Sequence, residues 1–175
     1  MIGAAFSWLI FIVTALVAVV ASILMVTRRN PIHSALWLIV TFFCIGILYL
    51  TLNAQFIAVA QVIVYAGAIM MLIIFVVMLI HLEKEQEQVG KMSGGKIIGS
   101  FITIILFLEI AAAILSFQVT GKQGTFTPEV LARVGDVKSV GTVLYGKYMF
   151  PFEVASILLL IGIVGAVVLS KGRKG

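Results

Sequence analysis

Three side chains in long apolar runs of this sequence have groups that could carry protons or bind water. Glu109 lies in the run ILFLEIAAAI, and Gln61 and Tyr65 lie in the run FIAVAQVIVYAGAIMMLIIFVVMLI. A carboxylate in such surroundings is costly if it is charged and unpaired, so Glu109 must be protonated, hydrated or paired. Glu109 is therefore either a proton-relay acid, a partner for a lysine of another subunit, or a residue near enough to the surface to be wet.

The second group lies beside three small residues. On an α-helix Gln61 and Tyr65 share one face, with Ala68 and Leu72 continuing the same line. The Ala-Gly-Ala triplet at 66–68 leaves the backbone thinly covered, so a neighbouring helix can approach closely or a turn can rewind. Because π-bulges cluster at functional sites and need a yielding backbone, the sequence permits a π-bulge here. The alternative is that Tyr65 only packs.

Composition places these side chains in a membrane. The chain has 175 residues, of which 62% are hydrophobic and 11% charged, and its mean hydropathy is +1.24. A soluble domain cannot bury that much apolar surface, so the bilayer must be the solvent. The formal net charge of +5 does not indicate nucleic-acid binding, because the basic residues are scattered through loops and form no basic face.

Five apolar stretches are long enough to cross a bilayer as helices. Asn30-Pro31 is a helix-start signal, and the short turn at 53–55 makes the second and third spans antiparallel neighbours. Two short surface helices are expected within 120–149, with a plain loop as the alternative. We predict an all-α integral membrane protein, a single membrane domain over 1–175, with spans at about 2–26, 31–52, 56–80, 97–119 and 152–170.

The basic residues favour one orientation, because cytoplasmic loops carry an excess of lysine and arginine. The N-terminus is then outside, the C-terminus is cytoplasmic, and the loop at 120–149 is extracytoplasmic. The richer face would carry Arg28, Arg29, Lys84, Lys91, Lys96, Lys171, Arg173 and Lys174, and the other face Lys122, Arg133, Lys138 and Lys147.

Motifs of redox chemistry are missing from the sequence. It contains no paired-cysteine motif for iron–sulfur clusters, no glycine-rich nucleotide loop after a strand and no metal-ligand cluster. We therefore expect no catalytic centre and no cofactor in this chain. If it serves a redox reaction, it does so as one part of a larger complex.

Several motifs together carry a resemblance. They are NPIHSA at 30–35, VYAGAIM at 64–70, FVVML at 75–79, GTVLY at 141–145, PFE at 151–153 and the apolar stretch at 155–169. With them the chain resembles, over nearly its full length, the J subunits of bacterial NADH–quinone oxidoreductase, respiratory complex I. The resemblance implies a membrane-arm subunit in the bacterial inner (cytoplasmic) membrane, packed against subunits H, A, K and N and the lipid bilayer. NADH, FMN, iron–sulfur clusters and quinone are then expected in other subunits.

In that family the third helix switches between an α form and a π-bulged form near a tyrosine and a glycine that match Tyr65 and Gly67. The switch is thought to gate a water path from the quinone region toward the proton-pumping subunits. Some members carry a glutamate where this chain has Gln61, which cannot ionise. Rewinding one turn would rotate the helix by about 100° and could move Met70 or Met71 as an apolar plug.

The coupling and gating residues expected here are therefore Gln61, Tyr65, Ala66, Gly67, Ala68, Met70 and Met71, with Glu109 as a candidate proton relay. Two alternatives stay open. One is a homologous membrane subunit of a cation/proton antiporter or membrane-bound hydrogenase complex. The other is a passive scaffold in the membrane arm, in which the small residues only pack.

Overall fold

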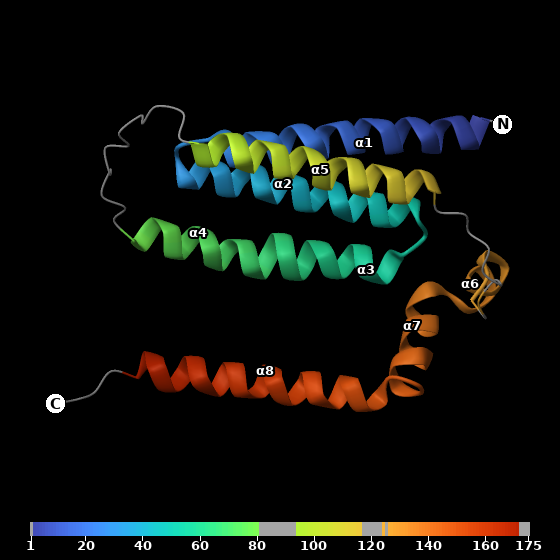
Figure 1. The fold of residues 1–175 in the computed structure, drawn as a ribbon. Helices are drawn as coiled ribbons and strands as arrows, with labels where there is room; N and C mark the ends of the chain where they lie inside the picture. Colours follow the sequence, from blue (N-terminus) through green and yellow to red (C-terminus); the bar gives the residue numbers. More distant parts are fainter. Residues whose placement is uncertain (1, 81–93, 117–123, 125, 172–175) are drawn as a thin grey trace. The chain divides into compact units, whose positions relative to one another are not determined.

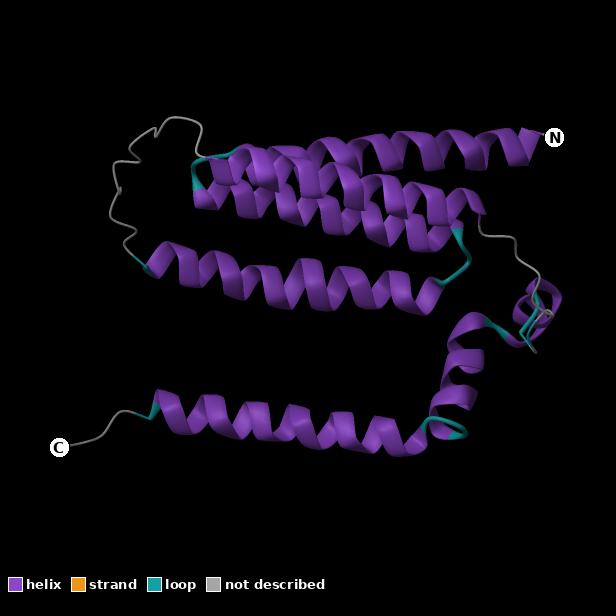
Figure 2. Ribbon diagram, in the orientation of Figure 1, coloured by secondary structure: helices purple, strands orange, loops and turns teal. Residues whose placement is uncertain are grey.

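The computed structural model describes residues 2–80, 94–116, 124 and 126–171 of the chain (Figure 1). Within those residues every regular element is a helix (Figure 2). Five helical stretches are long and apolar enough to cross a membrane. The predicted all-helical fold with five helices able to span a membrane is thus confirmed. The spans belong to α1 (Ile2–Thr27), α2 (Pro31–Thr51), a composite third helix (Gln55–Leu79), α5 (Gly94–Ser116) and α8 (Met149–Ser170).

The chain forms two compact units, residues 1–80 with 125–175, and residues 81–124. The helix α5 belongs to the second unit and is considered by itself. Several positions named above lie outside the described residues: the end of the predicted fourth span at 117–119, Lys84, Lys91, Lys122, Arg173 and Lys174.

A short connection folds α2 back along α1. The Asn30 side chain caps α2, since its Oδ1 accepts a hydrogen bond of 2.9 Å from the Ile32 amide, and Pro31 opens the helix where no amide donor is needed. The Ser34 hydroxyl donates to the Met25 carbonyl and joins the two helix ends. The helices α1 and α2 therefore run antiparallel and in contact (Figure 1).

A second tight turn leads from α2 into the third span. The Ala54 amide donates to the Tyr49 carbonyl, and Asn53 adopts a left-handed conformation with φ of 59°. Asparagine tolerates that conformation better than most residues. The third span then packs against α2, and α2 also packs against α1. Three segments make up this span: α3 (Gln55–Ala60), the π-helix η1 (Gln61–Ile69) and α4 (Met70–Leu79).

Two short helices precede the last span. They are α6 (Pro128–Val134) and α7 (Asp136–Tyr145), separated by Gly135, whose φ of 88° suits a glycine. The rings of Tyr145 and Phe152 meet edge-on at 5.2 Å and connect α7 to α8. The helix α8 begins at Met149 rather than at 152. Pro151 falls in its first turn, where backbone amides have no partner within the helix, so proline is tolerated there.

Candidate functional site

The middle of the third span is a π-helix from Gln61 to Ile69. At its end the Met70 amide donates to two carbonyls, those of Gly67, three residues back, and Tyr65, five residues back. The bond over five residues is the one typical of a π-helix. The helix stays continuous on both sides, through α3 and α4. The predicted π-form in the third helix is thereby confirmed, and it includes the whole Tyr-Ala-Gly-Ala motif.

Gly67 is suited to this local geometry. A Cβ atom added at Gly67 would lie 3.3 Å from the carbonyl oxygen of Val62, which is also five residues back. That is closer than ordinary van der Waals contact, so a side chain here would push against the widened turn. Glycine thus removes a steric obstacle to the π-form, as the Ala-Gly-Ala triplet suggested.

The inward face of the third span differs from the α-helical expectation. Gln61 and Ala66 are buried and Met70 is fully buried, whereas Tyr65, Ala68 and Leu72 are exposed. Placing Gln61, Tyr65, Ala68 and Leu72 on one face is therefore wrong for this form of the helix. The reason is the π-turn, which inserts one more residue between Gln61 and the next inward position. The buried positions follow as Gln61, Ala66 and Met70.

The helix α2 provides the surface against which this segment lies. A Cβ at Gly46 would be 3.2 Å from Cγ2 of Val62 and 3.7 Å from the carbonyl oxygen of Ala58, so the two backbones approach closely there. One turn along α2, the Phe42 ring meets the Tyr65 ring edge-on, with centroids 5.7 Å apart. Aromatic pairs prefer this geometry. Tyr65 thus sits at the margin of the interface, half exposed and held by Phe42.

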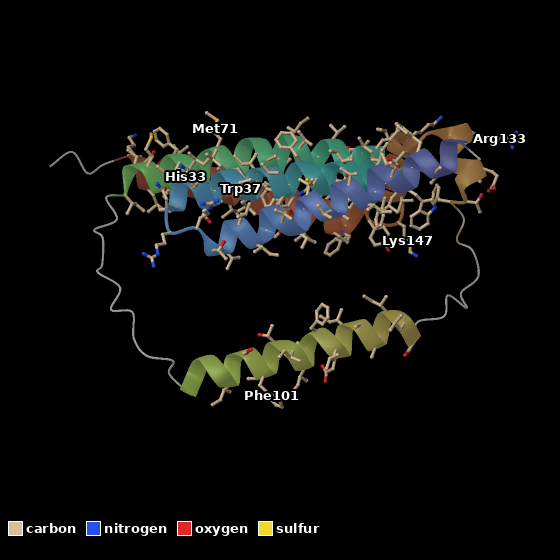
Figure 3. All side chains as sticks on the ribbon, turned by 90° about the horizontal axis from the view of Figure 1, so that it is seen from above. His33, Trp37, Met71, Phe101, Arg133 and Lys147 are labelled. Atoms are coloured by element: carbon tan, nitrogen blue, oxygen red, sulfur yellow. The ribbon has the colours of Figure 1, made fainter. Side chains whose placement is uncertain are left out.

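The two methionines after the π-helix have opposite surroundings. Met70 is 0% exposed, and Met71 is 76% exposed. Figure 3 shows the Met71 side chain pointing away from the helices of its unit. Beside α2 an open apolar groove of about 340 Å³ runs past the small side chain of Ala66. It is lined by Ile39, Ala66, Met71, Ile74, Phe75 and Met78.

Glu109 lies in α5, apart from the π-helix in sequence and in the other compact unit. Its side chain is exposed, and among the described side chains of α5 it is the one that can ionise. Its neighbours along the helix, Leu108 and Ile110, are 60% and 61% exposed apolar residues. Any group that pairs with Glu109 must approach this apolar surface.

Two residues of α2 that contact the third span, Gly46 and Phe42, were not predicted from the sequence. Neither Gly46 nor Phe42 carries a signal of its own, because their importance depends on which helix lies opposite. The short turn at 53–55 gave the only hint, since it predicts α2 as a neighbour of the third span. Within the residues that the structure describes, no group of three His, Cys, Asp or Glu side chains is placed to hold a metal ion.

Comparisons with known proteins agree on one family. The family model described as NADH-ubiquinone/plastoquinone oxidoreductase chain 6 matches residues 21–169. The NADH-quinone oxidoreductase subunit J of Escherichia coli (strain K12) is 36% identical over 159 residues, covering 89% of this chain and 82% of that protein. The chloroplastic NAD(P)H-quinone oxidoreductase subunit 6 of Zygnema circumcarinatum is 35% identical over 169 residues, covering 95% and 93%. The subunit J of Rhodobacter capsulatus is 30% identical over 164 residues, covering 91% and 79%.

Proposed function

Because the chain belongs to the NADH-ubiquinone/plastoquinone oxidoreductase chain 6 family, which includes the bacterial J subunits, we propose that it couples quinone reduction to proton translocation through its third span. It is a multi-pass membrane subunit of NADH-quinone oxidoreductase, an enzyme complex. The part assigned to it here is a gate: the π-helix Gln61–Ile69 rewinds and thereby opens or closes a water path. The redox cofactors and the quinone site would belong to other subunits.

One observation carries this proposal: the third span is a π-helix across the Tyr-Ala-Gly-Ala motif, and its first two inward positions, Gln61 and Ala66, are five residues apart. In the π-form the inward positions are Gln61, Ala66 and Met70. In an uninterrupted α-helix that begins from the same Gln61, the spacing of four would bring Tyr65 and Ile69 inward instead. The sequence thus allows two inward registers, which differ by one residue from Gln61 onward.

The exchange between the two forms has a defined direction. An α-turn holds fewer residues than a π-turn, so rewinding advances each residue of α4 by one position, about 100°. Ile69 would then point where Met70 points now, and Met70 where Met71 points now. The Tyr65 ring would leave Phe42 and move toward the groove beside Ala66, which is about 340 Å³ in this form.

Such a movement can control wetting. An apolar constriction that is blocked stays dry and stops proton transfer, whereas one that opens admits water. A difference of a few kcal/mol between the two forms is enough to change which one dominates. The methionine pair supplies the bulky, flexible groups that such a plug needs.

Cysteine accessibility tests this exchange in the assembled complex. The chain has a single native cysteine, the buried Cys44, so Cys44→Ala gives a background for single cysteines. We expect Met70→Cys to resist a water-soluble maleimide in the resting enzyme and to be labelled during turnover with NADH and quinone. Met70 is 0% exposed in the π-form, and rewinding would turn it to the position of Met71, which lines the groove that the proposed gate wets.

A matched position separates this effect from general loosening. Ile163→Cys in α8, where the native side chain is 64% exposed, should show equal labelling at rest and in turnover. Equal labelling of Met70→Cys under both conditions would mean that the third span does not rewind, and would favour the passive scaffold.

Orientation, location and neighbours complete the proposal. The distribution of basic residues supports an outside N-terminus, a cytoplasmic C-terminus and an extracytoplasmic segment at 120–149 within a single membrane domain. The bacterial relatives support the bacterial inner membrane, and the family resemblance supports subunits H, A, K and N as neighbours. The relatives reported above are all quinone oxidoreductase subunits by name, which favours this assembly over an antiporter or a hydrogenase.

Glu109 is proposed as a proton-relay acid in α5. We expect Glu109→Gln, which keeps the shape and removes the charge, to assemble normally and to lower proton pumping severalfold. The measurements are the yield of purified complex and the proton flux in proteoliposomes. Loss of assembly would instead assign Glu109 to an ion pair with another subunit, and unchanged assembly and flux would place it in contact with water.

A further inference from the structure

The N-terminal end of the third span has no side-chain cap of its own. Its N-cap residue is Ala54, which has no side chain to accept a hydrogen bond. The amides of the first helical turn lack partners inside the helix, so they need acceptors from elsewhere. The Phe56 amide has one: it donates to Oδ2 of Asp136 over 2.7 Å.

Asp136 comes from a distant part of the sequence. It is the first residue of α7, 80 positions after Phe56, and α7 contacts α3 (Figure 1). A carboxylate at a helix N-terminus is favoured by the helix dipole, and a hydrogen bond to a charged acceptor is stronger than a neutral one. The contact therefore joins the segment between the fourth and fifth spans to the start of the third.

The position of this contact matters for the switch. Only α3, with six residues, separates the cap from the π-helix. A rotation of about 100° between α- and π-forms must be taken up at one end of the span or the other. At the opposite end, in the described part of the chain, α4 consists of apolar side chains and has no side-chain hydrogen bond to another helix.

We propose that Asp136 is a positioning residue that fixes the rotation of α3, so that rewinding of the π-helix turns α4 and its methionines. The inference rests on the proposed function, because a helix that never rewinds has no rotation to direct. Without the carboxylate, the short α3 segment would absorb part of the rotation, and Met70 would move less. The role of Asp136 is thus mechanical and involves no contact with substrate.

The test combines Asp136 variants with two reporter cysteines in the assembled complex, in the Cys44→Ala background. With Asp136 present, Met70→Cys should gain maleimide labelling during turnover, and Gln55→Cys, at the capped end, should not change. With Asp136→Ala we expect the gain at Met70→Cys to fall about threefold or more, as for loss of an ordinary hydrogen bond, because this contact is exposed. Gln55→Cys should then begin to change during turnover.

Further variants keep the result interpretable. Asp136→Asn retains an oxygen acceptor and should restore most of the Met70→Cys gain, which a purely structural defect in α7 would not allow. Asp136→Leu fills a similar space without an acceptor and serves as a second removal variant if Asp136→Ala does not assemble. Glu129→Ala removes another first-turn carboxylate, from α6, and should leave both reporters unchanged.

Two failures can be told apart. If the Met70→Cys gain stays at full size in either removal variant, Asp136 does not position the span, and the switch itself stands. If Met70→Cys shows no gain even with Asp136 present, the proposed switch fails, and the positioning role fails with it.

Discussion

Replacing Gly67 with valine is expected to abolish most proton pumping in a complex that still assembles. In the π-form a Cβ at this position would lie 3.3 Å from the Val62 carbonyl oxygen, and valine adds two further carbons that cannot turn away freely. That contact disfavours the π-form relative to the α-form. A shift of about 1–3 kcal/mol changes the ratio of the two forms by roughly 5- to 150-fold.

Proton flux and NADH oxidation in proteoliposomes, together with the yield of assembled complex, measure this effect. Gly67→Ala should give a smaller loss, because its single Cβ needs a shift of only a few tenths of an ångström in the Val62 carbonyl. Gly162→Val in α8 is the matched control, since a Cβ at Gly162 meets nothing within 4 Å in this chain. Normal pumping by a well-assembled Gly67→Val complex would contradict a switch at this glycine.

The fold could be predicted from the sequence because its signals are local. Apolar length alone identifies a membrane span, and Asn30-Pro31 marks the start of α2 through a hydrogen bond between residues two apart. The Ala-Gly-Ala triplet likewise shows that a backbone can yield. Each of these signals depends on residues within one or two helical turns.

The register of the candidate site could not be predicted in the same way. The sequence is compatible with inward spacing of four, which selects Tyr65, and with inward spacing of five, which selects Ala66. In the structure the spacing of five is the one that packs against α2, with the close approach at Gly46 and the ring contact of Phe42. Asp136 was missed for a similar reason: its partner Phe56 lies 80 residues away and offers only a backbone amide.

This ambiguity of register bears on the proposed switch. A segment with one strongly preferred inward face would resist rewinding, because one form would bury apolar side chains and the other would not. Here both faces are apolar, and α4 has little amphipathic character, with Ile, Leu, Val, Met and Phe all around it. The burial of apolar side chains therefore differs little between the two forms, and the contacts of single residues can decide which form is more stable.

Met70 and Ile69 provide the decisive contacts, and truncating them should act in opposite directions. Met70 is fully buried in the π-form, so Met70→Ala leaves a cavity there, whereas Ile69 is 38% exposed and would be buried only after rewinding. Truncating a buried methionine costs about 2–5 kcal/mol, and we expect the lower end because lipid is as apolar as the site itself. Met70→Ala should thus lower the population of the π-form, and Ile69→Ala should raise it.

Structures of the two variant complexes at rest would measure these populations through the form of residues 61–69. Met71→Ala is the control, because Met71 is 76% exposed and its truncation leaves no cavity in the π-form of this chain. In the double variant with Ile69→Ala and Met70→Ala the two effects should largely cancel, since each form then loses one buried side chain. If both single variants kept the same helix form, Met70 and Ile69 would not compete for one inward position, and the one-residue rotation on which the gate depends would be excluded.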